Sequence, residues 1–551
     1  MKGAIHGGGI PLLASAPEKG TNCRDRELEF TAYWFDGKTP QRTLFQFDKG
    51  LSKKPFRIVP KGDMSGMHAS AMSAMEREGA KPYSRLVPRL HEPQWDAGVL
   101  EEVGRELTKG ARGSTPDNND LPAAYTYFGQ FVAHEISDIA EVNRRDGEIV
   151  SRTAALDLDS IFSVSEPMSS RRAVWRGGVG VGELSNNPEG GAYGDLPRED
   201  NPEDTRSTAE IGEIRNDHNM GVAQIHVAIS KFHHVLWQEA RPAEFNRRRT
   251  MRHVQAIVLF DYLRKICDAD VYGDVISNGR RIVRPGPFDH SHPFRIPIEF
   301  SAACFRIGHS MIRDRYTNWS QSGASTGLED LLGFTAMGGQ LNDTGGRLPA
   351  EWEADWSSLL GDPGAPGSTR NKAKAIDQFL NGQLGALRKQ WFPDDMHEAA
   401  ILGKLNLAIV TLKRGELFGI PSAQALAGAL APNGRGRLPV LPRDEILGSR
   451  VFGCADDSGL RRVVRNNDLH INTPLWLYCL LEAKYHHGGQ RMGPFASRIV
   501  CETIHVAIET CDDGIISNGF EINFTDRESF SRKREFTLHD LIAIAEQWQP
   551  N

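Results

Sequence analysis

Two histidines in this sequence lie in contexts that could support proton transfer or metal binding. The first is His134 in FGQFVAHEIS, where Gln130 precedes it by four residues and an acidic residue follows directly. Residues four apart on a helix share one face, so we expect both side chains to point toward one cavity. The second is His309 in EFSAACFRIGHSMIR, where Gly308 lacks a side chain and would let a flat macrocycle approach the backbone. Either histidine alone is more typical of a hydrogen-bonded core residue.

Three common catalytic motifs are excluded by their spacing. A zinc protease helix needs a second histidine four residues after His134, where this chain has Asp138. The GHSMI stretch lacks the closing glycine of a nucleophile elbow, because Ile312 stands there. GGVGVGE has Glu183 where a dinucleotide fingerprint needs its last glycine. What remains is a set of His, Arg and Gln side chains on separate predicted helices.

Six short motifs occur along the chain in the order YTYFGQFVAHEIS, LDLDSIF, IRNDHN, EFSAACFRIGHSMIR, TLKRGELFGIPSAQA and GGQRMGPFASRIV. In order and approximate spacing they resemble the animal-type haem peroxidases of the peroxidase–cyclooxygenase superfamily, particularly the bacterial-type members. The resemblance runs from about residue 83 to about residue 510. It implies a mainly α fold, a large single-domain helical haem peroxidase fold with long loops and little β. A b-type haem would lie between the helices that carry His134 and His309.

The resemblance assigns roles on both sides of the haem. His309 matches the proximal histidine, and an uncharged imidazole suits an iron that must reach a high oxidation state. His134 matches the distal histidine, which would take a proton from peroxide and return it to the departing oxygen. Arg215 matches the distal arginine, whose charge would stabilise that oxygen, with a surface salt bridge as the alternative. Gln130 would hydrogen-bond distal water or a small anion.

Two arginines match residues that pair with haem propionates. Arg306 lies one turn before His309, and Arg414 lies in LKRG. Fatty-acid dioxygenases of the superfamily carry a radical tyrosine at the position of Arg306, so its absence favours a peroxidase. The oxygenase alternative stays open because of three tyrosines nearby in the sequence: Tyr125, Tyr127 and Tyr316.

The RTAALDLDSIF stretch resembles the calcium-binding loop of the family. Thr153, Asp157 and Asp159 stand at ligand positions, and the carbonyl of Ala155 would be a further ligand. Glu135 occupies the place of the calcium-binding aspartate that follows the distal histidine, and its longer side chain would shift or weaken the site. Oxygen ligands from closely spaced acids suit a hard cation. The alternative interpretation is a solvated acidic loop.

The chain departs from the family at three positions near the haem. Mammalian members attach haem through ester bonds to acidic residues at positions where this chain has Ala133 and His218. Neither side chain can form that ester, so we expect haem b to be held noncovalently, with His218 ordering water or contacting substrate. The asparagine that accepts the proximal imidazole N–H aligns with Thr411, whose hydroxyl could accept the same bond and tune the iron. Asn406 would be the counterpart only if the helix register slipped.

The elements that must position these residues are mainly helices. Apolar residues recur at helical spacing over 123–140, 220–240, 250–268, 298–316, 396–414, 474–484 and 494–510. Long stretches rich in turn formers separate them and are typical of loops that wrap a functional core. LEFTAYWF is the one clear strand candidate near the N-terminus. We predict that residues 1–80 form an N-terminal arm and residues 81–551 the catalytic domain.

The composition excludes several functional classes. The chain has 551 residues, 39% of them hydrophobic, and no uninterrupted apolar run reaches the roughly 20 residues of a membrane span. A formal net charge of -6 gives no indication of a nucleic-acid partner. The seven cysteines are scattered without a CxxC spacing, which argues against a disulfide framework and a structural zinc site. Without a recognisable signal peptide, we expect a cytoplasmic protein.

These observations lead to one leading hypothesis and two alternatives. The leading hypothesis is a haem peroxidase that reduces hydrogen peroxide and oxidises a small organic donor or a halide through a high-valent haem. The second is a haem-dependent oxygenase that acts on a fatty acid or another apolar substrate. The third is a haem-binding protein in which the changes at positions 133, 218 and 411 have weakened catalysis.

Overall fold

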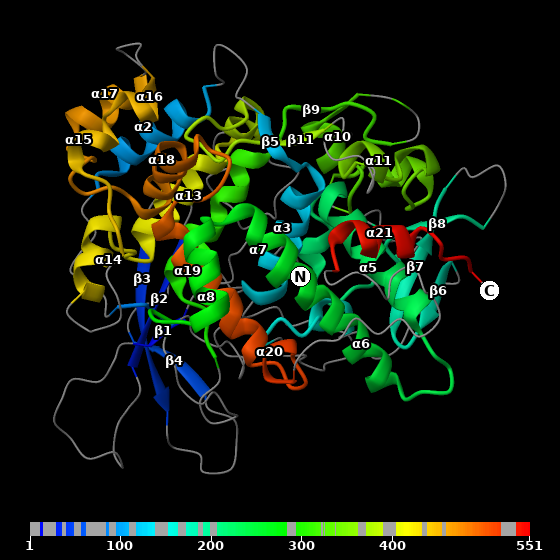
Figure 1. The fold of residues 1–551 in the computed structure, drawn as a ribbon. Coiled ribbons are helices and arrows are strands. Elements are labelled where there is room, and N and C mark those ends of the chain that lie inside the picture. The colour runs from blue at the N-terminus through cyan, green and yellow to red at the C-terminus, as the bar shows by residue number, and fades with distance from the viewer. Residues whose placement is uncertain are drawn as a thin grey trace.

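The structure is a computed structural model, and it describes four strands near the N-terminus and most of the chain from residue 84 onward (Figure 1). The described segments are 12–14, 29–35, 40–48, 57–61, 84–87, 95–109, 117–137, 153–162, 172–185, 191–198, 207–283, 294–320, 323, 325–336, 338–361, 371–388, 404–431, 438–453, 459–518 and 536–550.

Helices make up most of the described structure, so the prediction of a mainly α fold is confirmed (Figure 1). The α-helices are α2 (Ala97–Leu107), α3 (Ala124–Ser137), α4 (Asp159–Phe162), α5 (Met220–Leu236), α6 (Ala243–Ala256), α7 (Leu263–Ile266), α8 (Ala269–Asn278), α9 (Ile298–Ala302), α10 (Leu328–Gly333), α11 (Trp356–Leu359), α13 (Leu407–Leu417), α14 (Ala423–Leu430), α15 (Arg443–Ile446), α16 (Ser449–Phe452), α17 (Gly459–Asn466), α18 (Leu475–His487), α19 (Pro494–Glu509), α20 (Ile515–Asn518) and α21 (Leu538–Ala545). The 3-10 helices are η1 (Ile214–Asp217), η3 (Cys304–Met311), η4 (Gln340–Thr344), η5 (Ala350–Trp352) and η6 (Gly382–Gly385), and η2 (Ile257–Tyr262) is a π-helix. None of the described helices is long and apolar enough to cross a membrane.

The strands are short and pair in small antiparallel sheets. They are β1 (Leu12–Ala14), β2 (Glu29–Phe35), β3 (Pro40–Asp48), β4 (Arg57–Lys61), β5 (Asp117–Pro122), β6 (Ala173–Arg176), β7 (Val179–Glu183), β8 (Tyr193–Asp195), β9 (Arg315–Tyr316), β10 (Thr326–Gly327), β11 (Lys372–Lys374), β12 (Leu387–Arg388) and β13 (Lys404–Leu405). The first four form one sheet in the order β1-β2-β3-β4, and β6-β7-β8 form another. Strand β2 confirms the strand expected at LEFTAYWF. The division of the chain at residue 80 stays a prediction.

Helix α3 carries His134 through the centre of the molecule. Almost all of its residues are buried, as expected for a helix that packs on every side. Gly129 lets the hydroxyl of Tyr262 lie against the helix backbone, because a Cβ at that position would be 2.0 Å from the hydroxyl oxygen. The predicted helix is confirmed up to Ser137, and residues 138–152 lie outside the described residues. Helix α3 contacts α5, η1 and η3, which carry the other candidate site residues.

The predicted helix over 298–316 is wrong as a single element. Helix α9 ends at Ala302, and Ala303 has φ -135° and ψ -75°, outside the helical region. The chain continues as the 3-10 helix η3, in which residues three apart lie one above the other. Arg306 and His309 therefore share one face. At this break, Arg306 Nε donates a hydrogen bond to the backbone carbonyl of Ser301 (3.0 Å). Apolar spacing alone cannot distinguish this short 3-10 run from an α-helix.

Helix α13 begins later than the predicted 396–414, although residues 389–403 lie outside the described residues. Asn406 caps it, because its side-chain oxygen accepts a hydrogen bond from the backbone N–H of Ile409 (3.1 Å). The Asn406 amide also donates to the hydroxyl of Thr108 (2.7 Å). Both ends of this side chain are thus used within the α2–α13 contact, and the alternative in which Asn406 serves the proximal histidine is wrong.

Helices α18 and α19 both contact η3, as do α3 and β11. A buried carboxylate, Glu482 on α18, links the two helices because it accepts hydrogen bonds from the backbone N–H groups of Phe495 (2.8 Å) and Ala496 (3.2 Å). Burial raises the pKa of Glu482 to about 8. The first turn of α19 has backbone N–H donors without partners inside the helix, and the carboxyl oxygens of Glu482 accept from two of them, so this pair of bonds fixes how α19 meets α18 beside η3.

Three buried histidines on α5 and α6 are held neutral. His234 Nε2 donates to the carbonyl of Val179 (2.9 Å), and His253 Nδ1 donates to the carbonyl of Arg249 (2.6 Å). A ring nitrogen of His233 lies 2.9 Å from the hydroxyl of Thr250. Burial lowers the pKa of His233 to about 3 and the pKa values of the other two to about 4.

Protonation of these histidines is therefore expected to lower the stability of the protein in mildly acidic solution. Below about pH 6.5 a histidine of the unfolded chain binds a proton, whereas the same histidine in the folded protein stays neutral because its pKa is lower. The free energy of unfolding therefore falls as the pH drops. At pH 5 the loss is about 2 kcal/mol per histidine, because one pKa unit corresponds to about 1.4 kcal/mol. Urea unfolding at pH 5 and pH 7 measures it. His253→Phe should lose less stability between the two pH values, and equal losses in both proteins would contradict the prediction.

Candidate active site

His134 is buried and hydrogen-bonded to a residue from a different part of the chain. Its Nδ1 lies 3.0 Å from Oδ1 of Asn216 in η1, the residue directly after the predicted distal arginine. The amide nitrogen of Asn216 lies 3.1 Å from Nδ1 of His226 on α5. Burial, then the positive charge of Arg215, holds the pKa of His134 well below its usual range. His134 is therefore a neutral imidazole at physiological pH.

Arg215 is buried, and its guanidinium is paired with a carboxylate. Its Nε donates to one oxygen of Glu213 (2.8 Å), and its Nη2 donates to the other oxygen (2.6 Å). The same Nη2 donates to the backbone carbonyl of His134 (2.8 Å), which ties η1 to α3. The alternative of a surface salt bridge is wrong, because both partners are buried. The guanidinium does lie beside His134, as predicted, but an ion pair balances its charge.

A second buried ion cluster holds η1 in place. Arg198 donates from Nε to Asp195 at the end of β8 (2.8 Å) and from Nη1 to Asp217 in η1 (2.7 Å). The backbone N–H groups of Ala336 and Leu348 donate to the same two carboxylates. One cation thus joins two buried anions, and removing it would leave both uncompensated. This cluster therefore fixes the position of η1, which carries Arg215 and its neighbours.

Other predicted distal residues lie around His134. The oxygen of the Gln130 side chain accepts a hydrogen bond from the amide of Asn219 (3.1 Å), which also caps α5. The ring of His218 lies 6.3 Å from the ring of His134, nearly perpendicular to it. Burial lowers the pKa of His218 to about 4. Ala133 is half-buried on α3 and offers no group for an ester bond.

His309 lies in η3 among cationic and aromatic side chains. Burial, then the charges of Arg306 and Arg414, lowers the pKa of His309 to about 3, so its ring is also neutral. The ring of Trp476 on α18 lies 6.1 Å from the ring of His309 in a T-shaped arrangement. The indole N–H of Trp476 donates to the carbonyl of Arg306 (3.2 Å). Both arginines assigned to haem propionates are thus close enough to His309 to act on its charge.

The predicted hydrogen bond between His309 and Thr411 is not formed. The hydroxyl of Thr411 donates to the carbonyl of Leu407 one turn earlier in α13 (2.8 Å). Within the described part of the chain, the buried Nδ1 of His309 has no hydrogen-bond partner. A threonine inside a helix can satisfy its hydroxyl on the carbonyl one turn earlier, as Thr411 does here. The substitution therefore removes the expected acceptor.

The surroundings of His309 fit a haem group. A Cβ added at Gly308 would meet no atom within 4 Å, so there is open space beside the backbone next to this histidine. A neutral imidazole is the form that binds haem iron, and the two nearby guanidinium groups suit carboxylate partners. Since α3 contacts η3, the elements that carry His134 and His309 pack against each other.

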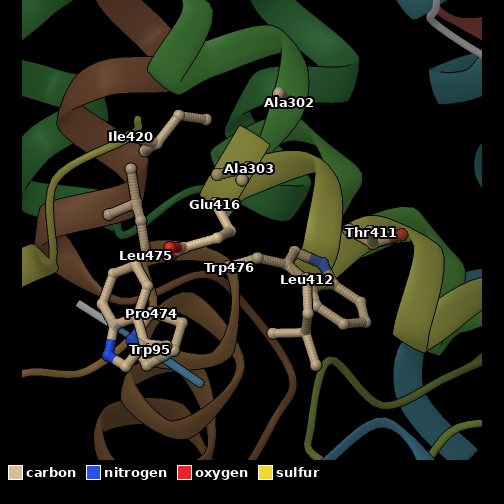
Figure 2. A pocket seen from close by; sticks show the side chains of 11 residues that line it. Trp95, Ala302, Ala303, Thr411, Leu412, Glu416, Ile420, Pro474, Leu475 and Trp476 are labelled. Carbon is tan, nitrogen blue, oxygen red and sulfur yellow. The ribbon is translucent and has the colours of Figure 1, made fainter. Parts of the chain in front are cut away.

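A small pocket lies beside Trp476 (Figure 2). It encloses about 260 Å³, part of it open to solvent. Residues from α9, α13, the start of α18 and the segment before α2 line it, with Thr411 and Glu416 among them. Neither His134 nor His309 lines this pocket. It is therefore not a space between the two histidines.

The acidic residues of the predicted calcium loop do come together. One carboxylate oxygen from each of Glu135, Asp157 and Asp159 lies within 4.8 Å of the others, although α3 is some distance from the loop in sequence. Thr153 donates from its hydroxyl to Asp157 and from its backbone N–H to Asp159, both at 2.7 Å. Glu135 is buried and accepts from the backbone N–H of Ser160 (3.3 Å). The arrangement could hold a cation with oxygen ligands.

Four residues of the site were not identified from the sequence. Asn216 follows Arg215 in IRND and Glu213 directly precedes that motif, so a search for partners of a buried arginine and a distal histidine would have found them nearby. His226 and Trp476 carry no local signal, because only the packing of α5 and α18 brings them to the site. These are the residues that set the charge and the hydrogen bonding around the predicted ones.

No family model matches this sequence, and no curated protein matches it. Several solved structures share its fold. Peroxidase A from Dictyostelium discoideum aligns at 16% identity over 86% of this chain and 95% of its own, with a TM-score of 0.49. Fatty acid alpha-dioxygenase from Oryza sativa aligns at 13% identity over 85% of this chain and 80% of its own, with a TM-score of 0.50. The Arabidopsis thaliana fatty acid alpha-dioxygenase aligns at 14% identity over 86% of this chain and 80% of its own, also with a TM-score of 0.50.

The likeness to the two dioxygenases concerns the course of the backbone, because the identities are low. These neighbours belong to the peroxidase–cyclooxygenase superfamily. The described structure agrees with that architecture in its many helices and few small sheets. The chain therefore has the mainly α-helical peroxidase–cyclooxygenase fold, with long loops and little β structure.

Proposed function

We propose that this protein is a haem peroxidase that reduces hydrogen peroxide and oxidises a small organic donor or a halide. The observation that carries the proposal is a pair of neutral imidazoles, the buried His134 and the partly buried His309, on elements that pack against each other. Each has cationic side chains beside it, Arg215 near the first and Arg306 with Arg414 near the second. The motifs shared with bacterial-type members of the superfamily support the same assignment.

His309 would bind the haem iron, and Arg306 and Arg414 would pair with the haem propionates. When bound, the haem supplies the electrons that split the O–O bond and recovers them from the donor. His134 would accept a proton from one peroxide oxygen and donate it to the other, departing oxygen. Its neutral form permits this role. Arg215 stabilises negative charge on that oxygen, with an effect reduced by its ion pair to Glu213.

An absorption spectrum of the protein purified from cells supplied with haem tests the proposal. A Soret band at one haem per chain, followed by a rapid spectral change on mixing with peroxide and return with a phenolic donor, is expected. Haem binding without any reaction with peroxide would instead support a haem-binding protein with weakened catalysis. Failure to bind haem at all would reject the proposal.

The haem is expected to be extractable. Ala133 and His218 occupy the positions of the ester-forming residues, and neither can form an ester. Acid combined with an organic solvent should therefore move all the haem into the organic phase. Haem that remains with the polypeptide after denaturation would contradict noncovalent binding.

Oxygenation of a fatty acid is the second candidate, and a buried tyrosine pair favours it. The hydroxyl of Tyr127 on α3 donates to the hydroxyl of Tyr316 (2.7 Å), seven residues after His309. Trp319 packs edge-on against both rings. Two fold neighbours are named as fatty acid alpha-dioxygenases, and hydrogen-bonded tyrosines are readily oxidised groups. Oxygen uptake on addition of a long-chain fatty acid, without peroxide turnover of a phenol, would favour this candidate over the peroxidase.

We also propose that Glu135, Thr153, Ala155, Asp157 and Asp159 bind calcium. Three carboxylates converge there, and like charges that close together are unfavourable without a cation. Because Glu135 follows His134 directly, the ion would fix the end of α3 that carries the distal histidine.

Calcium is expected to raise the thermal stability of the protein. An ion at 100 times its dissociation constant stabilises the folded state by about 2.7 kcal/mol, because it binds only that state. Melting curves with excess EDTA and with added Ca²⁺ measure the shift. Asp157→Asn should abolish it, whereas Asp274→Asn, outside this cluster, should keep it. A melting temperature independent of Ca²⁺ in the wild type would show that the acidic loop is only solvated.

A further inference from the structure

Asn216 lies between two buried histidines and contacts both of them. Its side-chain oxygen is 3.0 Å from Nδ1 of His134, and its side-chain nitrogen is 3.1 Å from Nδ1 of His226. We propose that Asn216, oriented by His226, locks His134 in the tautomer that carries hydrogen on Nδ1 and none on Nε2. The role of His134 as a base rests on the proposed function, whereas the lock itself does not.

The chemistry of the amide determines the tautomer of His134. A carbonyl oxygen can only accept a hydrogen bond, so His134 must donate from Nδ1. A neutral imidazole carries a single N–H, and its other nitrogen, Nε2, then has a lone pair available to accept a proton. His134 is buried, and its Nδ1 faces the amide oxygen at 3.0 Å. Asn216 therefore decides which nitrogen of His134 can act as the base.

His226 lies at the nitrogen end of the Asn216 amide. The amide nitrogen can only donate, so Nδ1 of His226 accepts and its Nε2 carries the hydrogen. If the amide were turned over, its N–H₂ group would face Nδ1 of His134 and require the opposite tautomer there. The ring of His226 is held edge-on against Phe131 of α3 at 6.3 Å. The tautomers of the two histidines are thus coupled through the amide of Asn216.

Burial and the surrounding ion pairs keep this arrangement in place. Asn216, His134 and His226 are all buried, so an amide that turned over would have to reverse the tautomers of both histidines or leave mismatched polar groups with little access to water. Asn216 sits in η1 between Arg215 and Asp217, and both of these neighbours are fixed by buried ion pairs. The backbone cannot easily shift to accommodate a different side-chain orientation. Asn216 and His226 are accordingly positioning residues for His134.

Nuclear magnetic resonance of ¹⁵N-histidine-labelled protein, purified and kept without peroxide, tests the lock. Two other buried histidines serve as internal references because backbone carbonyls fix their tautomers. His253 donates from Nδ1 to Arg249, and His234 donates from Nε2 to Val179. We expect long-range ¹H–¹⁵N correlations of His134 to match the pattern of His253. The opposite pattern for His134 in the wild-type protein would overturn the proposal without any variant.

Two variants separate the contribution of the Asn216 amide from that of His226. Asn216→Leu should change the His134 correlations to the Nε2–H pattern or a mixture, and His226→Phe should do the same in part, while both references stay unchanged. Unaltered His134 correlations in both variants would overturn the proposal. In each variant, cleavage of peroxide by the haem-loaded protein should slow by roughly 10–100-fold, the usual effect of losing a supporting hydrogen bond. A wild type that shows the lock but never reacts with peroxide would reject the proposed function alone.

Discussion

Replacing His309 by alanine is expected to abolish stoichiometric haem binding. This is the largest effect we predict, because the imidazole would supply the protein's bond to iron, while the two nearby arginines offer only charge to the propionates. Titration of the apoprotein with haem, followed at the Soret band, measures the stoichiometry. Addition of free imidazole to His309→Ala should restore part of the spectrum, because the small ligand can occupy the vacated space beside Gly308.

A matched control distinguishes loss of the ligand from general damage. His253 is a buried histidine of the core, and it lies in α6, outside the candidate site. His253→Ala should lose stability but keep one haem per chain. If His309→Ala bound haem with an unchanged spectrum, another residue would be the ligand, and the assignment of η3 to the proximal side would be wrong.

Replacing His134 by alanine is expected to leave haem bound and to slow peroxide cleavage by roughly 100- to 10,000-fold, the usual contribution of general acid–base catalysis. Stopped-flow mixing of the ferric protein with peroxide measures the rate. Because burial and Arg215 hold the pKa of His134 well below its usual range, the neutral base persists into mildly acidic solution. The wild-type rate should therefore stay constant through neutral pH and fall only on the acid side.

His218 provides the comparison for this variant, since its ring lies 6.3 Å from that of His134 and it has no assigned part in proton transfer. His218→Ala should retain most of the rate of peroxide cleavage. Equal turnover in wild type and His134→Ala would remove the proposed mechanism, whatever the haem content. A larger loss in His218→Ala than in His134→Ala would transfer the acid–base role to His218.

The ion pair between Arg215 and Glu213 alters what the distal arginine can contribute. A lone buried guanidinium would carry a full charge in a medium of low dielectric constant, whereas the paired one presents a dipole with its donor groups largely committed. This pairing and the missing acceptor for His309 Nδ1 are the two points at which the observed contacts differ from the pattern that the motifs imply.

The sequence by itself determined the helical architecture and the residue types of the site. Helix α3 was predictable because its apolar pattern and the Gln130–His134 spacing depend only on neighbours along the chain. The same holds for Thr153, Asp157 and Asp159, which hydrogen-bond to one another within a single short loop. The order and spacing of the motifs were sufficient to predict the fold class. Both depend on the sequence of helices along the chain and not on which helices contact each other.

Only the tertiary structure decided which partner each polar group takes. Asn216 joins His134 to a histidine on α5, Glu213 neutralises Arg215, and the hydroxyl of Thr411 turns to its own helix. The physical reason is that a buried donor or acceptor must be satisfied by whatever group the packing brings within about 3 Å, and several candidates compete for each position. The sequence shows which polar groups are possible partners, but the choice among them depends on distances between segments far apart in the chain.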